Sequence, residues 1–490
     1  MGVRVCKESG VECMCEAFIV GLVWVVNWRV LGYGLVVDDV RRVKDVLGGL
    51  YERCGGLRWC GERLYGVGTF AWRCCRGEDR CVKCVGSGGW RVNVRVERVL
   101  TVLMTSVVGV LIYWVFGRGE VSLAAAVLYV INPVNHQVTV WLNGRRYMMV
   151  VVVVLLMMLV PYGILLYPLT YLFHGSGIFA PVVLGLGWEW VFVPFMLLVN
   201  RKRLKKFVGS RLKMIVSPDL LNWSPKRLLV CVKMFGFHFW QMVFPWRVRM
   251  SYGYLSEWGM NREGNEAAYR IDLRFWLGVA ALGLGVGGLF TEQRWYFLFI
   301  LIGLGQWCGV VSVFQYCADR YVSVVNIFVM YLLSFWTYKL FGFYGTVVLV
   351  GVAGYYLAEL LHVMEMYRDM DHYFEYHRFY DPKNPVVGKF HVNARLQNKD
   401  VLGAWELVKE GLKHHPTDFT TLFQAGVVTQ ALGDVMASEE YFSRAEKNYY
   451  IGQEEVWKGK LGELRKVNRD FLEKNRTYLK PKSKSFSKKS

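Results

Sequence analysis

The chain has 490 residues, of which 54% are hydrophobic and 20% are charged, and its mean hydropathy is +0.25. A soluble protein carries about 25% charged residues and only short apolar runs. Here apolar runs long enough to cross a bilayer, about 17–25 residues, recur between residues 17 and 362. This excludes a soluble enzyme, a disordered chain and a small disulfide-stabilised domain, and it predicts an all-α, polytopic helical membrane protein.

Basic residues outnumber acidic ones, with 59 Lys and Arg against 39 Asp and Glu and a net charge of +20. They are spread over the loops between apolar runs and over the C-terminal tail, whereas a nucleic-acid-binding protein concentrates such charge on one soluble surface. Anionic lipid and the positive-inside rule account for this distribution. We therefore expect a lipid bilayer, and no nucleic acid, among the partners.

The apolar runs predict about eleven spans. These runs lie at residues 17–37, 99–117, 120–133, 147–168, 170–188, 190–200, 227–245, 273–290, 294–314, 322–340 and 341–362. The loop 201–227 holds nine basic residues and one acidic residue, so the positive-inside rule places it in the cytoplasm. Counting spans from this loop places the N-terminus in the cytoplasm and everything after residue 362 on the opposite side, which is periplasmic, extracellular or luminal.

The sequence predicts five successive parts. They are an N-terminal cytoplasmic segment at 1–16, a transmembrane domain at 17–362 with 38–98 as its first exterior loop, a linker at 363–385, helical repeats with a capping helix at 386–475, and a tail at 476–490. The tail is basic and contains no acidic residue, which is typical of disorder.

Residues 386–450 repeat with a period of about 34 residues, the size of a tetratricopeptide helix–turn–helix unit. In the second copy, Gly426 stands where two helices would approach closely, and Gly433-Asp434 stands at the turn. The inner face of the following helix is expected to carry Phe442 and Ala445. One period earlier, the matching positions are held by Lys399-Asp400, Ala404, Val408, Gly411 and Pro416.

Stacked units of this kind form a concave surface that binds peptides. We expect that surface around Phe423 and Gln424. Because two copies are fewer than the three usually needed for independent stability, the repeats are expected to lean on the transmembrane domain or on helix 453–475. The alternative is a helical hairpin that serves only as a spacer.

Polar and charged residues gather where several spans end, on the face opposite the basic loop. Such residues cost free energy in lipid unless they pair with one another or serve a site. The candidates are Asp38 and Asp39 after the first span, His136, Gln137, Trp141, Arg145 and Arg146 in the loop 134–146, Glu189 between two spans, and Asp319, Arg320 and Tyr321 in a later loop. Taken singly, each residue is better explained as an interfacial anchor or a solvated loop residue, whereas the convergence of the set on one face favours function.

The residue types indicate the chemistry. A carboxylate at the membrane boundary, such as Asp38 or Asp39, can deprotonate a hydroxyl or hold a metal ion. Its structural alternative is a helix cap or an ion pair with Arg41-Arg42. Arginine binds phosphate through its planar guanidinium group, so Arg145 and Arg146 are candidates for phosphate binding. The alternative is that both side chains only reach to the membrane interface.

Four segments resemble, in order, the membrane O-mannosyltransferases that carry tetratricopeptide repeats. The loop NPVNHQVTVWLNGRRY is similar to their His-Pro-[Val/Ile]-His-x-Glu-x-Val-x-Trp-[Ile/Leu]-x-Gly-Arg signature. It keeps Pro133, Val134, Trp141, Leu142, Gly144 and Arg145, and it has Asn132, Asn135 and Gln137 where the signature has His, His and Glu. ADRYVSVV resembles the Glu-Arg-Tyr-x-Tyr-Leu-Pro loop, GLGWEWVFVP resembles the Ser-Lys-Glu segment, and GYGLVVDD resembles the stretch with the acidic pair.

The resemblance spans residues 17–450 and implies a multispan, GT-C-type glycosyltransferase, as a divergent bacterial or viral relative. It implies a polyprenyl-phosphate sugar donor and a protein or glycan acceptor. Carried over, Asp38 or Asp39 is the catalytic base, while Arg145, Arg146 and Arg320 bind the donor phosphate. His136, Gln137, Trp141, Glu189, Asp319 and Tyr321 support the site. A divalent cation is compatible with this reaction, and no metal ligands are assigned.

Six cysteines lie in the first exterior loop, at positions 54, 60, 74, 75, 81 and 84. On an exterior face they can form disulfides, with fifteen possible pairings. Cys74-Cys75 with Cys81-x-x-Cys84 is instead compatible with zinc, although a second, separated Cys-x-x-Cys is missing.

Two other functions compete with the transferase. A transporter would line its substrate path with intramembrane polar residues, but the two halves show no evident internal repeat and the polar residues gather on one face. A membrane-anchored repeat scaffold would use the repeats to recruit a partner. It would not need Asp38, Asp39 or Arg145.

Overall fold

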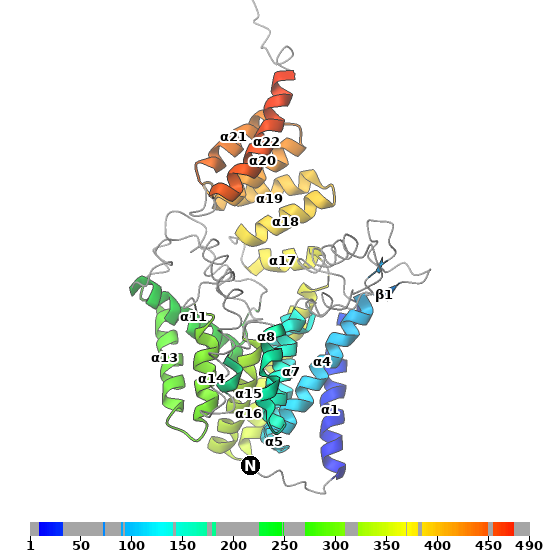
Figure 1. Cartoon of the computed structure of the whole chain (residues 1–490), viewed down its shortest axis with the longest axis vertical. Coiled ribbons are helices and arrows are strands. Elements are labelled where there is room, and N and C mark those ends of the chain that lie inside the picture. Colours follow the sequence, from blue (N-terminus) through cyan, green and yellow to red (C-terminus); the bar gives the residue numbers. More distant parts are fainter. Residues whose placement is uncertain are drawn as a thin grey trace, which may run out of the picture. The chain divides into compact units, whose positions relative to one another are not determined.

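The structure is a computed structural model that folds into two compact units, one ending at Tyr380 and one formed by the C-terminal helices. It describes residues 9–32, 72–73, 90–91, 94–140, 144–173, 179–182, 225–246, 248, 270–308, 322–368, 370–380, 385–448 and 454–474. Apart from the turns between elements, these residues are helical, with one short antiparallel pair of strands, β1 (Trp72–Arg73) and β2 (Trp90–Arg91) (Figure 1). The prediction of an all-α fold is confirmed.

The first unit contains the helices that precede residue 381. They are α1 (Ser9–Asn27), η1 (Trp28–Gly32), α4 (Val94–Val115), α5 (Glu120–Ile131), α6 (Pro133–Val140), α7 (Arg145–Leu159), η3 (Gly163–Leu166), α8 (Tyr167–Phe173), α11 (Pro225–Val243), α13 (Leu273–Gly288), α14 (Arg294–Gly305), α15 (Ser323–Phe341), α16 (Tyr344–Met366) and α17 (Met370–Tyr380). The second unit contains α18 (Pro385–Gln397), α19 (Val401–His414), α20 (Phe419–Ala431), α21 (Val435–Glu446) and α22 (Glu454–Lys474).

Four helices in the described part of the chain are long and apolar enough to cross a membrane: Val11–Leu31, Arg98–Val115, Ser323–Phe341 and Tyr344–Met366. A fifth span results if α6 and α7, which are bent by 112°, are counted together. Helices α5, α11, α13 and α14 are apolar but shorter. A 12-residue helix such as α5 rises only about 18 Å, less than the bilayer core of about 30 Å. The described residues therefore do not confirm the expected count of about eleven spans, and residues 183–200 of the expected set lie outside them.

The first span begins earlier than predicted, because the structure pairs its acidic residues. Glu16 accepts a hydrogen bond from the Trp114 indole at 2.7 Å, and Glu12 forms an ion pair with Arg118 at 3.0 Å. Both partners lie at the C-terminal end of α4 or just after it. These contacts bring residues that hydropathy had assigned to a cytoplasmic segment into helix α1.

The predicted span 147–168 is divided at a proline. Helix α7 ends at Leu159, and Tyr162, directly after Pro161, has a left-handed backbone with φ of 57°. Proline cannot donate the backbone hydrogen bond that would continue the helix. The chain restarts as η3 and α8 after this turn.

Helices α11 and α13 pack closely through glycine. A Cβ atom added to Gly278 would lie 2.2 Å from the carbonyl oxygen of Val232, and one added to Gly236 would lie 2.5 Å from the Cα of Gly278. The buried Lys233 side chain forms an ion pair with Asp272 at 3.1 Å, across the same helix pair. Small residues let the two backbones approach, and the paired charges offset the cost of burying the lysine.

The Gly278→Ala substitution should destabilise the first unit by about 2 kcal/mol, because the added methyl group would overlap backbone that cannot move without separating the helices. Thermal unfolding in detergent would measure this loss. Gly283→Ala in the same helix is the control, since nothing lies within 4 Å of its added Cβ. Equal melting temperatures for the two variants would contradict this interpretation of the helix contact.

The predicted linker 363–385 contains helical structure. It holds the end of α16 and the helix α17, whose Tyr373, Phe374 and His377 are buried. Charged residues in this segment lower its mean hydropathy, so hydropathy does not indicate a helix here. The buried residues nevertheless fall on one helical face.

In the second unit, the turns recur with the predicted period. Lys399 and Gly433 both have a left-handed backbone, with φ of 61° and 86°. Asp400 accepts a hydrogen bond from the Gly403 amide, and Asp434 does the same for Ala437. Each turn therefore reverses the chain and caps the following helix by the same local chemistry. The predicted turn positions are confirmed.

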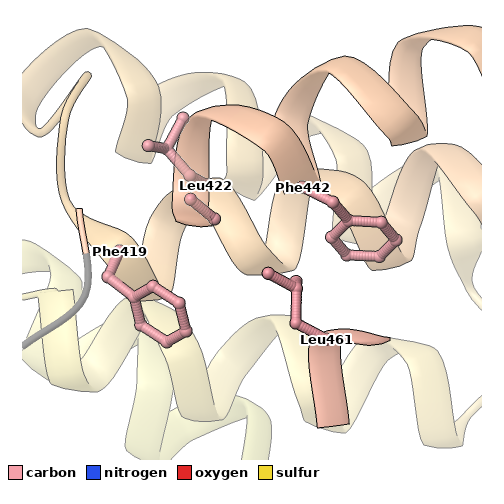
Figure 2. Close-up of a cluster of buried hydrophobic side chains, with 5 residues drawn as sticks. Phe419, Leu422, Phe442 and Leu461 are labelled. Atoms are coloured by element: carbon pink, nitrogen blue, oxygen red, sulfur yellow. The ribbon is translucent and has the colours of Figure 1, made fainter. Parts of the chain in front are cut away.

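The core of the second unit joins three helices. Phe419 and Leu422 of α20, Phe442 and Ala445 of α21 and Leu461 of α22 form one buried cluster (Figure 2). A Cβ atom added to Gly426 would lie 2.4 Å from the Phe442 ring. The predicted positions of Gly426, Phe442 and Ala445 are thus confirmed, and α22 closes the cluster.

Polar contacts connect α22 to α20 and α21. Asn468 accepts a hydrogen bond from Gln430 at 2.7 Å and donates one to the Ser438 hydroxyl at 3.0 Å. Arg465 pairs with Glu439 at 2.5 Å and also with Glu446. The hydrogen bond to Glu439 raises the pKa of Arg465. Because these contacts need a particular register, they determine how α22 is placed along the stack.

Replacing Gly426 by alanine should destabilise the second unit by about 1–3 kcal/mol, because the Phe442 ring has no room to move. Hydrogen exchange of the α20 and α21 peptides in the full-length protein would report this loss. The control is Gly459→Ala in α22, where nothing lies within 4 Å of the added Cβ; it should be neutral or slightly stabilising. Unchanged protection in the Gly426 variant would contradict the close contact.

Candidate functional site

The candidate site begins at a helix break inside the first unit. Helix α5 ends at Ile131. The next residue, Asn132, has an extended backbone, and α6 starts at Pro133. The Asn132 Oδ1 atom accepts a hydrogen bond from the Val134 amide at 3.0 Å. Proline at the first helical position needs no hydrogen-bond acceptor. Pro133 therefore ends one helix, as predicted, and also starts the next.

The segment 134–146 was expected to be an exterior loop, and this prediction is wrong for residues 134–140. They belong to helix α6, of which all eight residues are buried. Because α6 is short and contains Asn, His, Gln and Thr, hydropathy favours a solvated loop. The structure instead buries it against α4, α5, α7, α15 and α16.

Asn132 joins α6 to two other helices. Its Nδ2 atom donates to the Met242 carbonyl oxygen at 2.9 Å and contacts the Met330 sulfur at 3.6 Å. The last carbonyls of a helix have no partner within it. In α11, the Met242 carbonyl accepts from Asn132, and the Tyr356 hydroxyl lies 3.1 Å from the Met242 oxygen and 2.8 Å from the Val243 oxygen. The helix break is therefore tied to the end of α11.

Threonines of α4 bind the other side of α6. The Thr105 hydroxyl lies 3.0 Å from the Thr101 carbonyl oxygen and 3.4 Å from the Thr139 hydroxyl, within hydrogen-bonding distance of both. Arg145, at the start of α7, donates from Nε to the Thr101 hydroxyl at 2.8 Å. The Arg145 side chain is buried, so it does not snorkel to the membrane surface. Gly144 permits this geometry, because a Cβ atom there would lie 2.7 Å from the Val138 Cα.

His136 and Gln137 lie in the middle of α6 and are both buried. The His136 ring makes an edge contact with the Tyr367 ring, at 5.4 Å between centroids. Among the described residues, no hydrogen-bond partner is found for the His136 Nε2 atom. The segment thus gathers an imidazole, amides and a guanidinium inside an apolar unit, where each costs free energy unless it is bonded.

The predicted site residues fall into three groups. The structure places His136 and Gln137 on α6 and Arg145 and Arg146 on the neighbouring helix α7, and Arg146 is partly exposed. It places Phe423 and Gln424 in the second unit. The other predicted site residues lie outside the described residues: Asp38, Asp39, Trp141, Glu189, Asp319, Arg320 and Tyr321. The six cysteines of the first exterior loop also lie outside them.

Phe423 and Gln424 contribute to the packing of their own unit. The Gln424 side chain is buried and donates from Nε2 to the Lys389 carbonyl oxygen at 2.8 Å. The Phe423 ring lies 5.9 Å from each of the Phe419 and Phe442 rings, between centroids. In the structure these two residues connect the helices of the stack.

Sequence reasoning missed Thr101, Thr105, Tyr129 and Asn326. Thr101 and Thr105 lie one turn apart in an apolar run, and Asn326 interrupts another such run, so a search for polar residues at helical spacing would have found them. In the part of the chain that the structure describes, no group of three or more His, Cys, Asp or Glu residues is placed to hold a metal ion.

Comparisons with protein families, curated proteins and solved structures find no match to this chain.

Asn132→Leu should destabilise the first unit by about 1–3 kcal/mol, because the Val134 amide loses its side-chain acceptor and the Met242 carbonyl keeps only the Tyr356 hydroxyl, at 3.1 Å, which also binds Val243. Thermal unfolding in detergent would measure the loss. The control is Thr346→Val, which removes a hydroxyl that donates to Tyr338 near the start of α16, away from the helix break. A melting temperature for Asn132→Leu no lower than that of Thr346→Val would contradict the role assigned to Asn132.

Proposed function

We propose that the chain is a membrane glycosyltransferase that moves a sugar from a polyprenyl-phosphate carrier to a hydroxyl group of a protein or glycan on the non-cytoplasmic face. The observation that supports this most is the buried segment α6–α7, which presents His136, Gln137 and Arg145 inside an apolar helical unit. A ligand that is polar at one end and apolar along its chain suits such a place, and a polyprenyl phosphate has both properties.

The proposed chemistry needs two groups. The departing carrier phosphate develops negative charge, which a guanidinium group stabilises. We assign this role to Arg145, and the resemblance assigns it to Arg146 and Arg320 as well. The acceptor hydroxyl needs a base, assigned to Asp38 or Asp39. In the sequence these residues follow η1, which packs against α4, the helix whose Thr101 binds Arg145.

A divalent cation bridging the carrier phosphate and an aspartate would supply the same charge stabilisation. The second unit, with its period of two helices, is proposed to be tetratricopeptide-like and to hold the acceptor. Its local turn chemistry supports this, because Asp400 and Asp434 cap equivalent helices.

A transporter is the second candidate. The 112° bend between α6 and α7 favours it, since broken helices often bind substrates within transporters. A scaffold anchored by its spans has no need to bury Arg145 and His136, so these residues argue against it.

Transfer assays on the purified chain in lipid nanodiscs would test the transferase, with a panel of polyprenyl-phosphate sugars and with or without EDTA. The Asp38→Asn/Asp39→Asn double variant should lose about 100-fold or more of the turnover, because a general base contributes about 10²–10⁴-fold. Arg145→Gln should also be impaired, whereas Arg118→Gln, which removes an arginine that is paired with Glu12, should retain activity.

Turnover that survives the double substitution would move the base to Glu189 or Asp319. A protein that folds but transfers no sugar from any carrier would reject the transferase, and sugar or carrier uptake into vesicles would then support the transporter.

A further inference from the structure

Asn326 is a fully buried amide in α15 whose bonding capacity is unused. Its side chain has no solvent exposure, and neither Nδ2 nor Oδ1 has a hydrogen-bond partner among the described residues. Asn132, equally buried in the same unit, uses both of its amide atoms. Buried polar groups in native proteins are almost always bonded, so the contrast between these two asparagines requires an explanation.

The contacts of neighbouring residues show which way Asn326 faces. Ser323 and Met330 lie on the same helical stripe as Asn326, one turn before it and one turn after it. The Ser323 carbonyl oxygen accepts a hydrogen bond from the Tyr129 hydroxyl at 3.2 Å, and the Met330 sulfur contacts Asn132 at 3.6 Å. Asn326 is therefore placed on the face of α15 that packs against the end of α5.

Two more unused atoms lie around that helix end. Asn135 donates from Nδ2 to the Tyr129 carbonyl oxygen at 2.8 Å, but its Oδ1 has no partner among the described residues. The Nε2 atom of the next residue, His136, also has no hydrogen-bond partner among the described residues. Tyr129 connects the two sides, because its hydroxyl binds α15 and its carbonyl binds Asn135.

The unused atoms define the kind of group that would satisfy them. They comprise one amide donor, two amide oxygens that accept, and an imidazole nitrogen that can do either. A phosphate at neutral pH offers mainly acceptors and would leave the amide oxygens unsatisfied. A cation would leave the amide N–H group unsatisfied. Hydroxyl groups both donate and accept, so two neighbouring hydroxyls can bind both atoms of one asparagine.

We infer that Asn326, together with the Asn135 amide oxygen, recognises hydroxyl groups of the ligand, as a sugar-binding subsite between α5, α6 and α15. The inference deepens the proposed function and rests on it for the identity of the hydroxyl-bearing group as the transferred sugar. It separates two tasks, with Arg145 assigned to the carrier phosphate and the asparagines assigned to the sugar.

The test compares Asn326→Leu with wild type in nanodiscs, using three probes: bare undecaprenyl phosphate, undecaprenyl-phosphate sugars, and methyl α-glycosides of the same sugars. Leucine keeps the branched shape of asparagine without its polar atoms. Wild type should bind at least one sugar-bearing carrier about tenfold more tightly than the bare carrier, as one well-formed pair of hydrogen bonds allows. Asn326→Leu should abolish this difference and leave binding of the bare carrier unchanged.

Stability supplies an independent measurement. Without ligand, Asn326→Leu should melt at the same temperature as wild type or higher, because it removes unsatisfied polar atoms. The matched control Asn132→Leu makes the same change of side chain and should melt lower, because it removes polar atoms that are bonded. A drop for Asn326→Leu as large as that of the control would overturn the inference, since the amide would then be structural.

Two binding results would also overturn the inference. The first is a sugar preference that persists in Asn326→Leu, as expected if the amide binds only water. The second is a wild-type protein that binds neither the carrier-linked sugars nor the methyl glycosides. Failure of the proposed function gives a different result. A wild-type protein that binds methyl glycosides through Asn326 but never transfers sugar from a carrier would retain the subsite and reject the transferase.

Discussion

The first unit depends on one constraint: inside an apolar environment, every interrupted backbone must find its hydrogen bonds within the protein. The break between α5 and α6 and the end of α11 meet this constraint together. Asn132 bonds both a broken helix start and a helix end, and Tyr356 completes the second. These contacts join segments more than 100 residues apart in sequence, with separations of 110 and 113, so the hydrogen bonds at the helix break and at the end of α11 form only when distant parts of the chain have come together.

In the second unit, the helix turns and caps are formed by residues that are close together in sequence. The turns at Lys399-Asp400 and at Gly433-Asp434 each use a residue in the left-handed region followed by an aspartate cap, and α20 and α21 then pack through Gly426 and the Phe442 ring. Little of this depends on distant sequence, so the unit can repeat. The polar network around Asn468 and Arg465 then closes the stack by fitting α22 to it in one register.

This difference explains what could be predicted from the sequence. Gly426, Gly433-Asp434 and Phe442 were predicted correctly, because a turn, a cap and a close helix contact are each decided by a few neighbouring residues. Helix α6 was mistaken for a loop, because its burial depends on helices such as α15 and α16, which are far away in sequence. The site was predicted in part for the same reason: His136, Gln137 and Arg145 were recognised by type, whereas the partners that hold this segment, such as Thr101 and Thr105, were not. Asn326 shows the limit most clearly, since its environment is entirely tertiary.

The ion pair between Lys233 and Asp272 has a consequence for how the protein is made. A lysine in the middle of a lone helix costs about 2.5–3.5 kcal/mol to insert at the bilayer centre, and α11 leaves the ribosome before α13 has been synthesised. The carboxylate that neutralises Lys233 arrives only with Asp272, at the start of α13. In a bilayer, the two helices would therefore be inserted most favourably as a preassembled hairpin, with the Lys233–Asp272 pair and the glycine contact already formed.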